Sequence, residues 1–205
     1  MKKNIISFII VLLLFVAMPV SAERIGDVPE LTDHDKVTIH LFYASWCHNC
    51  HNFLTYMKDK YEDYTDYFEI KTYLVSSDSN GQRISIPENA EIMDRVAEFY
   101  GTDAAFPLII IGKDFFQLGY PETAGPLIIE KALEEYQNED YEDTVAKLIK
   151  ENNYSTSKIE GYYEACTQSG IDCGKTDNTA AYILVGVFVV LLGGLTALVI
   201  AGKKK

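Results

Sequence analysis

An uncharged apolar segment near the carboxyl terminus constrains this chain more than any other feature. The segment runs from Ala180 to Ala201 and contains no Asp, Glu, Lys or Arg. A helix rises about 1.5 Å per residue, so a segment of this length reaches across a hydrocarbon layer roughly 30 Å thick. We therefore expect a transmembrane helix over residues 180–202. The lysines that follow, residues 203–205, are expected to form a basic tail on the cytoplasmic side.

The amino terminus has the three parts of a secretory signal. Two lysines precede an apolar run from Ile5 to Ala17, and residues 20–22 read Val-Ser-Ala. This order of charged start, short apolar core and small-x-small end predicts a signal peptide over residues 1–22. An uncleaved anchor is the alternative, although the apolar run is short for a membrane span. With both ends interpreted in this way, residues 23–179 lie outside the cytoplasm.

The stretch between the two ends is long enough for one domain with its own core and a connecting segment. The chain carries 30 acidic and 18 basic residues, and five of the basic residues are lysines at its two extremes. The middle of the chain is therefore strongly acidic. Such a surface argues against nucleic acid or anionic lipid as a partner, and otherwise it only favours solubility.

Apolar spacing through the middle of the chain predicts an α/β domain with the order β-α-β-α-β-β-α. A polar stretch at residues 76–86 contains the turn signal Asn80-Gly81. We expect strands at 38–43, 68–75, 108–111 and a short partner ending near 118, and helices from 48, over 87–100 and over 123–150.

The middle helix has recognisable ends. Pro87 suits its first turn, and Gly101 is placed just past its last residue. The spacing predicts that its buried stripe consists of Ile92, Val96 and Phe99.

Residues 151–179 are polar and weakly patterned, which favours a juxtamembrane linker. This segment contains Cys166 and Cys173, with six residues between them. In an exported chain such a pair is typical of a small structural loop closed by a disulfide. The alternative is a second redox pair that passes electrons to a membrane partner.

Cys47 and Cys50 stand where a predicted strand becomes a predicted helix. The first turn of a helix has unpaired N–H groups and a partial positive charge, both of which stabilise a thiolate. A second cysteine one turn further on is close enough to attack a mixed disulfide. We therefore assign Cys47 as the nucleophile and Cys50 as the resolving thiol. The alternative is a purely structural disulfide.

Two separated motifs resemble the thioredoxin family. Residues 42–50, Phe-Tyr-Ala-Ser-Trp-Cys-His-Asn-Cys, resemble its active-site segment, and residues 106–110, Phe-Pro-Leu-Ile-Ile, resemble its cis-proline and the strand that follows. Residues 119–120, Gly-Tyr, resemble the glycine after its hairpin. The resemblance covers roughly residues 36–150.

The resemblance implies a thioredoxin-like fold and thiol–disulfide exchange without a dissociable cofactor. It also implies that Pro107 follows a cis peptide bond and stacks beside the Cys47–Cys50 pair. Phe106 is then expected to help present backbone to an extended substrate. Trp46, immediately before the pair, and His48 and Asn49, between its two cysteines, are expected to shape the same site.

The chain departs from the thioredoxin pattern at two places. Leu41 stands where that family has a buried aspartate, so carboxylate-assisted proton transfer to Cys50 is not expected from that position. The residues between the cysteines are His48 and Asn49. A protonated His48 would stabilise the thiolate and favour an oxidant; the alternative is an exposed polar side chain.

Residues 47–51 also fit the pattern C-x-x-C-H of covalent haem attachment. Metal binding by Cys47, Cys50, His48 and His51 is a related alternative. The predicted strand before the motif and the motif at 106–107 favour the redox interpretation, so we expect no metal.

The sequence thus predicts a single-pass cell-membrane protein with an extracytoplasmic thiol–disulfide oxidoreductase domain over residues 23–150. Its expected partners are thiols and disulfides of exported proteins, or an integral membrane electron carrier. A non-catalytic binding module of the same fold is the alternative from another functional class.

Overall fold

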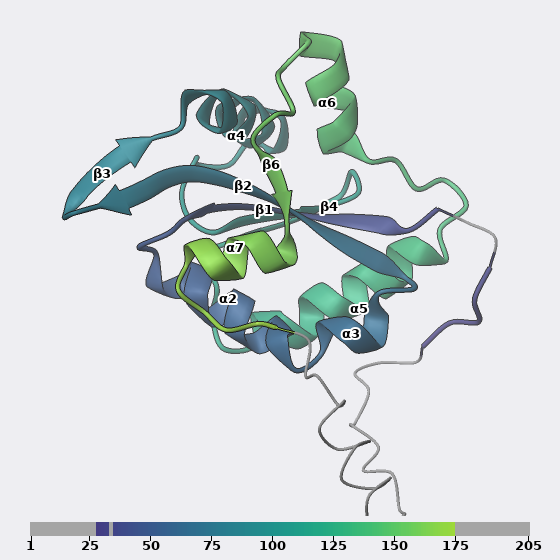
Figure 1. The fold of residues 1–205 in the computed structure, drawn as a ribbon. Helices are drawn as coiled ribbons and strands as arrows, with labels where there is room; N and C mark the ends of the chain where they lie inside the picture. The colour runs from purple at the N-terminus through teal and green to yellow at the C-terminus, as the bar shows by residue number, and fades with distance from the viewer. Residues whose placement is uncertain (1–27, 33–34, 175–205) are drawn as a thin grey trace, which may run out of the picture.

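The structure is a computed structural model that describes residues 28–32 and 35–174 (Figure 1). The predicted signal peptide and the predicted transmembrane helix lie outside these residues. Among the residues that the structure describes, no helix combines the length and the apolar character that a membrane crossing requires. The described part is an α/β fold with one central sheet and helices on both faces, which confirms the predicted fold class at that level.

A single mixed sheet forms the centre of the molecule. Its strands, in chain order, are β1 (Val37–Ala44), β2 (Phe68–Ser79), β3 (Gln82–Ser85), β4 (Leu108–Ile111), β5 (Phe115–Leu118) and β6 (Ile159–Gly161). The order across the sheet is β3-β2-β1-β4-β5, with β1 parallel to β2 and antiparallel to β4. Both β3 and β6 pair with β2, so the outer edge of β2 is covered over two separate stretches.

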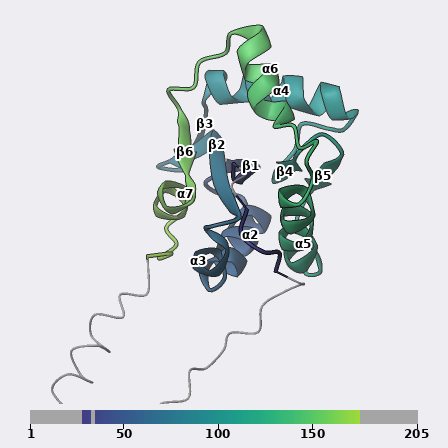
Figure 2. The same ribbon diagram turned by 90° about the vertical axis from the view of Figure 1, so that its right-hand side faces the viewer.

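Six helices cover the two faces of the sheet within the described residues. They are α2 (His48–Lys58), α3 (Tyr61–Tyr64), α4 (Pro87–Tyr100), α5 (Ala124–Tyr136), α6 (Thr144–Asn152) and α7 (Tyr162–Gln168). Helices α2, α3, α5 and α7 lie on one side, and α4 and α6 lie on the other (Figure 1 and Figure 2). The sheet is therefore buried on both faces, which is the usual condition of a strand made almost wholly of apolar residues.

Strand β1 shows how the sequence builds these two layers. All eight of its residues are buried. Because successive side chains of a strand point to opposite faces, Ile39 and Leu41 enter the core beneath α2 and α5, whereas Phe42 enters the core beneath α4 and α6. Each such side chain contributes roughly 1.5–3 kcal/mol of burial free energy.

Helix α4 has the predicted ends but not the predicted stripe. It begins at Pro87, and Gly101 caps it in the left-handed conformation with φ 63°. Phe99, however, is 54% exposed. Besides Ile92 and Val96, the buried stripe includes Met93 and Ala97, which lie one residue further along each turn.

Two further predictions about the elements are corrected by the structure. The predicted helix over residues 123–150 is two helices, α5 and α6, separated by residues 137–143. The polar stretch at residues 76–86 is not only a loop: β2 continues to Ser79 and forms a hairpin with β3 across the Asn80-Gly81 turn.

The predicted linker is also corrected, because residues 151–174 belong to the folded domain. Strand β6 pairs with residues 71–73 of β2, and α7 packs against α2 and β2. Tyr162 and Ala165 of α7 are buried in the core beneath α2. The folded domain therefore continues past residue 150, where the sequence placed its boundary, at least to Cys173, which is buried in the same core.

Candidate functional site

Cys47 and Cys50 form a disulfide at the start of α2. Their sulfur atoms are 2.22 Å apart and their Cα atoms 5.2 Å apart. Cys47 is the N-cap residue, and its Sγ accepts a hydrogen bond from the backbone N–H of Cys50 at 3.2 Å. The first turn of α2 contains no acidic residue. An anionic sulfur at this position is therefore stabilised by the helix start with no nearby carboxylate on that turn to oppose it.

The two sulfurs differ in access. Cys47 retains 7% of its surface, whereas Cys50 retains none. Cys50 shares one face of α2 with Phe53, Leu54 and Met57, all of which are buried. The outer cysteine is thus the one that a partner can reach, and the inner cysteine lies behind it.

Trp46, the residue before Cys47, contacts the second of the two sequence motifs. The ring of Trp46 meets Phe106 edge to face, with centroids 6.1 Å apart. The Phe106–Pro107 peptide bond is cis, as the sequence resemblance implies, and Pro107 is buried. The backbone N–H of Gly119 donates to the Pro107 carbonyl at 2.8 Å, which attaches this loop to the end of β5.

The three polar residues of the motif have different surroundings. His48 and Asn49 are exposed on the first turn of α2, whereas His51 is half-buried. The Nε2 atom of His51 lies 2.7 Å from the carbonyl oxygen of Ser45. A ring nitrogen in that contact carries the proton and cannot ligate iron at the same time. This geometry favours the redox interpretation of C-x-x-C-H over haem attachment.

Among residues 28–32 and 35–174 no group of three or more His, Cys, Asp or Glu side chains could hold a metal ion.

Leu41 is fully buried in the same apolar cluster as Cys50. This position therefore supplies no carboxylate to take a proton from the inner thiol.

The sequence interpretation missed the part of the site that comes from the β2–β3 hairpin. The carbonyl of Ser76 accepts from the backbone N–H of Ser45, and the Oγ of Ser45 accepts from the backbone N–H of Asp78, both at 3.0 Å. The Oγ of Ser76 accepts from Nε1 of Trp46 at 3.2 Å. The guanidinium carbon of Arg83 on β3 lies 3.7 Å from the Trp46 ring centroid. The Asn-Gly turn was the sequence signal for this hairpin.

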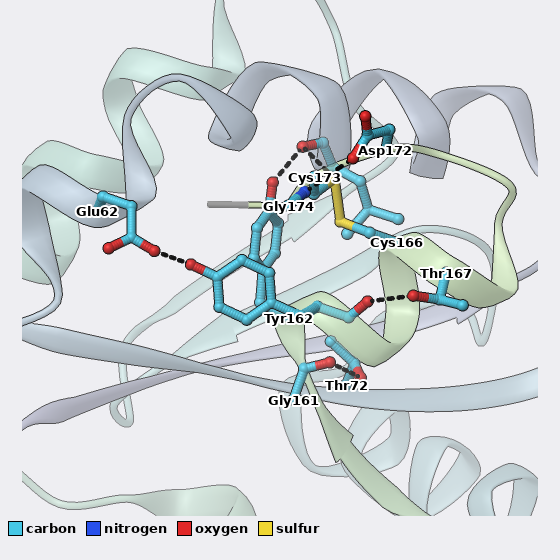
Figure 3. The surroundings of a disulfide bond; sticks show 11 residues. Glu62, Thr72, Gly161, Tyr162, Cys166, Thr167, Asp172, Cys173 and Gly174 are labelled. Carbon is cyan, nitrogen blue, oxygen red and sulfur yellow. Dashed lines mark hydrogen bonds between the residues drawn. A yellow bond between two sulfur atoms is a disulfide. The ribbon is translucent and has the colours of Figure 1, made fainter. Parts of the chain in front are cut away.

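A second disulfide joins Cys166 on α7 to Cys173 in the segment that follows it (Figure 3). The predicted pairing is therefore present. The two residues retain only 1% and 4% of their surface. The Sγ of Cys173 lies 3.9 Å from the carbonyl oxygen of Leu54, and the hydroxyl of Tyr162 donates to the same carbonyl at 2.7 Å. This disulfide thus fixes α7 against α2.

A buried polar group occupies the opposite face of the sheet. His40 on β1 contacts the hydroxyl of Tyr73 through Nδ1 at 2.9 Å and the carboxylate of Asp143 through Nε2 at 2.8 Å. Asp143 also caps α6 by accepting from the N–H of Ala146. Burial alone would raise the pKa of Asp143, but the contact with His40 and the Ala146 N–H hold that pKa below its ordinary value. Burial raises the pKa of Tyr73.

Comparison of the chain with models of known protein families, with curated proteins and with solved structures finds no significant match to any of them. The functional inference therefore depends on the residues of the site and on the sequence motifs that form it.

Proposed function

We propose that this chain is a thiol–disulfide oxidoreductase of thioredoxin-like fold. The observation that carries the proposal is the position of Cys47, whose Sγ accepts the Cys50 N–H at the start of α2 while Cys50 lies fully buried behind it. An accessible sulfur at a helix start, followed by an inner sulfur within bonding distance, is what two-step disulfide exchange requires.

The reaction has two displacement steps. In the direction of partner reduction, the Cys47 thiolate attacks one sulfur of a partner disulfide, and the other partner sulfur leaves as a thiolate. The Cys50 sulfur, as a thiolate, then attacks Cys47 Sγ and displaces the second partner sulfur. The partner gains two electrons and two protons, and Cys47 and Cys50 become a disulfide. The reverse sequence oxidises a partner dithiol.

The arrangement of the sheet supports the thioredoxin-like assignment. Strand β1 is followed by the helix that carries the cysteines and then by the parallel strand β2. The antiparallel pair β4 and β5 comes later, and the Phe106–Pro107 turn precedes β4. The contact between Trp46 and Phe106 brings the two sequence motifs that resemble the family to one place.

The cellular setting is part of the same proposal and is supported by the sequence alone. With a signal peptide over residues 1–22 and a membrane helix over 180–202, the domain is tethered on the extracytoplasmic side. Its partners are then exported proteins with cysteines, or a membrane protein that exchanges electrons with the Cys47–Cys50 pair. The exchange needs no dissociable cofactor, since both reacting sulfurs belong to the chain.

The decisive experiment is a redox titration of the full-length chain against a glutathione series. The two redox states of Cys47–Cys50 are counted by alkylation and peptide mass spectrometry, so that Cys166 and Cys173 are scored separately. A reduction potential of about −120 to −180 mV would indicate that the pair oxidises partners or isomerises their disulfides. A potential near or below about −270 mV would indicate a reductant. A pair that does not exchange with glutathione at all would overturn the proposal.

A further inference from the structure

The β2–β3 hairpin is attached to the segment that carries the reactive cysteines. Ser45 makes two hydrogen bonds to this hairpin. Its backbone N–H donates to the carbonyl of Ser76, and its Oγ accepts from the backbone N–H of Asp78. The hairpin therefore lies beside the start of α2. The four residues of β3 itself are exposed. Strand β3 is thus exposed and, through the hairpin, attached to the segment that carries Cys47.

The contact between Arg83 and Trp46 is the closest approach of β3 to the site. The guanidinium carbon lies 3.7 Å from the indole ring centroid, a distance typical of a stacked guanidinium. Within the described residues Arg83 takes part in no ion pair. Asp78 is its cross-strand neighbour, but the Asp78 carboxylate accepts from the N–H of Gly81 in the turn. The guanidinium of Arg83 thus stacks on the indole of Trp46 and does not pair with the carboxylate of Asp78.

Trp46 is consequently held by three groups from two parts of the chain. Ser76 binds its indole N–H, Arg83 covers its ring, and Phe106 meets it edge to face. The residue next to Trp46 is Cys47, and the residue next to Phe106 is Pro107. The indole is therefore the link between the reactive cysteine and the proline turn, and its orientation determines the shape of the surface on which a partner segment lies.

We propose that the β2–β3 hairpin is one wall of the surface that binds an extended, cysteine-containing segment of the partner, and that Arg83 is a positioning residue that holds Trp46 for this binding. The inference rests on the proposed function and specifies its docking surface. Arg83 acts on the polypeptide around the partner's cysteine and leaves the sulfur chemistry unchanged. The rate with a small disulfide that lacks an extended polypeptide to dock is therefore expected not to depend on Arg83.

The test compares two substrates in single-turnover reactions of the reduced full-length chain. One substrate is a synthetic peptide with a single intramolecular disulfide, and the other is glutathione disulfide. Arg83→Ala is expected to raise the half-saturating peptide concentration about 2- to 5-fold, the range of an exposed cation–π contact, without changing the limiting rate. Its rate with glutathione disulfide is expected to equal that of the wild type.

Two further variants and one spectroscopic signal complete the test. Arg83→Lys keeps the charge but not the planar guanidinium, so its half-saturating concentration is expected between those of the wild type and Arg83→Ala. Gln82→Ala is the matched control: because successive side chains of a strand point to opposite faces, Gln82 is exposed on the face of β3 away from Trp46, and no effect is expected. Trp46 is the one tryptophan of the chain. Its emission maximum is expected to move to longer wavelength in Arg83→Ala and to stay unchanged in Gln82→Ala.

The outcomes separate this inference from the proposed function. Equal behaviour of Arg83→Ala and Gln82→Ala in both kinetics and emission would overturn the inference. So would an equal loss with peptide and glutathione disulfide, because Arg83 would then act on the sulfur chemistry. A wild-type chain that reacts with neither substrate would refute the proposed function and, with it, the docking role. The tryptophan emission of Arg83→Ala would in that case still report whether Arg83 holds the indole.

Discussion

The chain contains two disulfides with similar geometry in contrasting surroundings. The Cα–Cα distances are 5.2 Å for Cys47–Cys50 and 5.8 Å for Cys166–Cys173. The first pair begins a helix, and its outer sulfur accepts a helix N–H. The second pair closes a loop after α7, and both of its cysteines are buried in the core beneath α2. The spacing of the cysteines along the chain does not by itself account for this contrast.

We expect the surroundings of each disulfide to decide its role. Exchange needs a thiolate that a partner can reach and that the protein stabilises. The position of Cys47 meets both requirements. Cys173 instead faces the carbonyl oxygen of Leu54, a partial negative charge that disfavours a thiolate. Both pairs lie at α2: the first begins this helix, and Cys173 of the second contacts the Leu54 carbonyl on it. The predictions below test whether the two roles are as separate as this comparison indicates.

The largest expected effect is on Cys47. Cys47→Ser removes the only sulfur that a partner can reach in the pair, so exchange with a peptide disulfide is expected to fall at least about a thousandfold. Cys50→Ser leaves the attack but removes the resolving sulfur, and covalent mixed disulfides should accumulate. Single-turnover kinetics and non-reducing electrophoresis measure the two effects. Asn52→Ala, an exposed change on α2 outside the Cys47–Cys50 motif, is the matched control and should retain activity.

This prediction also distinguishes an enzyme from a binding module. If Cys50→Ser traps no partner and Cys47→Ser still binds partners as the wild type does, the pair is a structural disulfide. The two disulfides would then not differ in role, and the comparison fails.

The next effect concerns the second pair. Cys166→Ala with Cys173→Ala opens a loop with a sequence separation of 7. The loop-closure model gives a loss of about 2–3 kcal/mol in the free energy of unfolding. Urea denaturation of the full-length chain measures this loss. The reduction potential of Cys47–Cys50 is expected to stay unchanged, and a loss of exchange activity in the folded double variant would indicate that the second pair carries electrons.

A third variant separates loss of stability from loss of a disulfide. Asp143→Asn removes the carboxylate that pairs with His40 and is expected to cost about 1–2 kcal/mol without touching either cysteine pair. Because the pKa of Asp143 is lowered in the folded state, its contribution is fully present above the unfolded-state pKa and is lost as pH falls through the folded-state pKa.

The pH dependence provides the measurement for Asp143. The difference in unfolding free energy between the wild type and Asp143→Asn should be largest near neutral pH and should disappear in acid, below both pKa values of the carboxyl. Exchange activity near neutral pH should equal that of the wild type. A variant of this kind that loses activity would indicate that modest destabilisation alone disturbs the site.

The sequence predicted the elements that repeat a strong local pattern. The buried strand β1, the cap of α4 by Gly101 and the placement of Cys47 at a helix start follow from apolar spacing and end signals. Among the short elements, β4 and β5 were predicted, whereas β3, β6, α3 and α7 were missed. Strand β6 has three residues and exists only because the edge of β2 is available to it.

The break between α5 and α6 has a similar explanation. Residues 137–143 contain no glycine or proline, so the strongest signals that end a helix are absent, and the N-cap residue Asp143 is the local sign of a new helix. The break is stabilised by contacts with distant β1: Tyr141 accepts the N–H of Thr38, and His40 holds Asp143 as the cap of α6. Contacts between residues about a hundred positions apart are not readable from periodicity. The contact between Arg83 and Trp46 also joins different elements and is likewise not readable from periodicity.

The smallest expected effect tests how the surroundings tune the first pair. His48 is exposed on the first turn of α2, immediately after Cys47. When its imidazole is protonated, the positive charge stabilises the thiolate and hence the reduced form of the pair. His48→Gln is therefore expected to make the reduction potential more negative, whereas His48→Lys, which keeps a positive charge at this position, is expected to leave it unchanged. For an exposed charge worth about 0.5 kcal/mol the shift is about 10 mV. An equal shift in His48→Lys would exclude the positive charge as its cause.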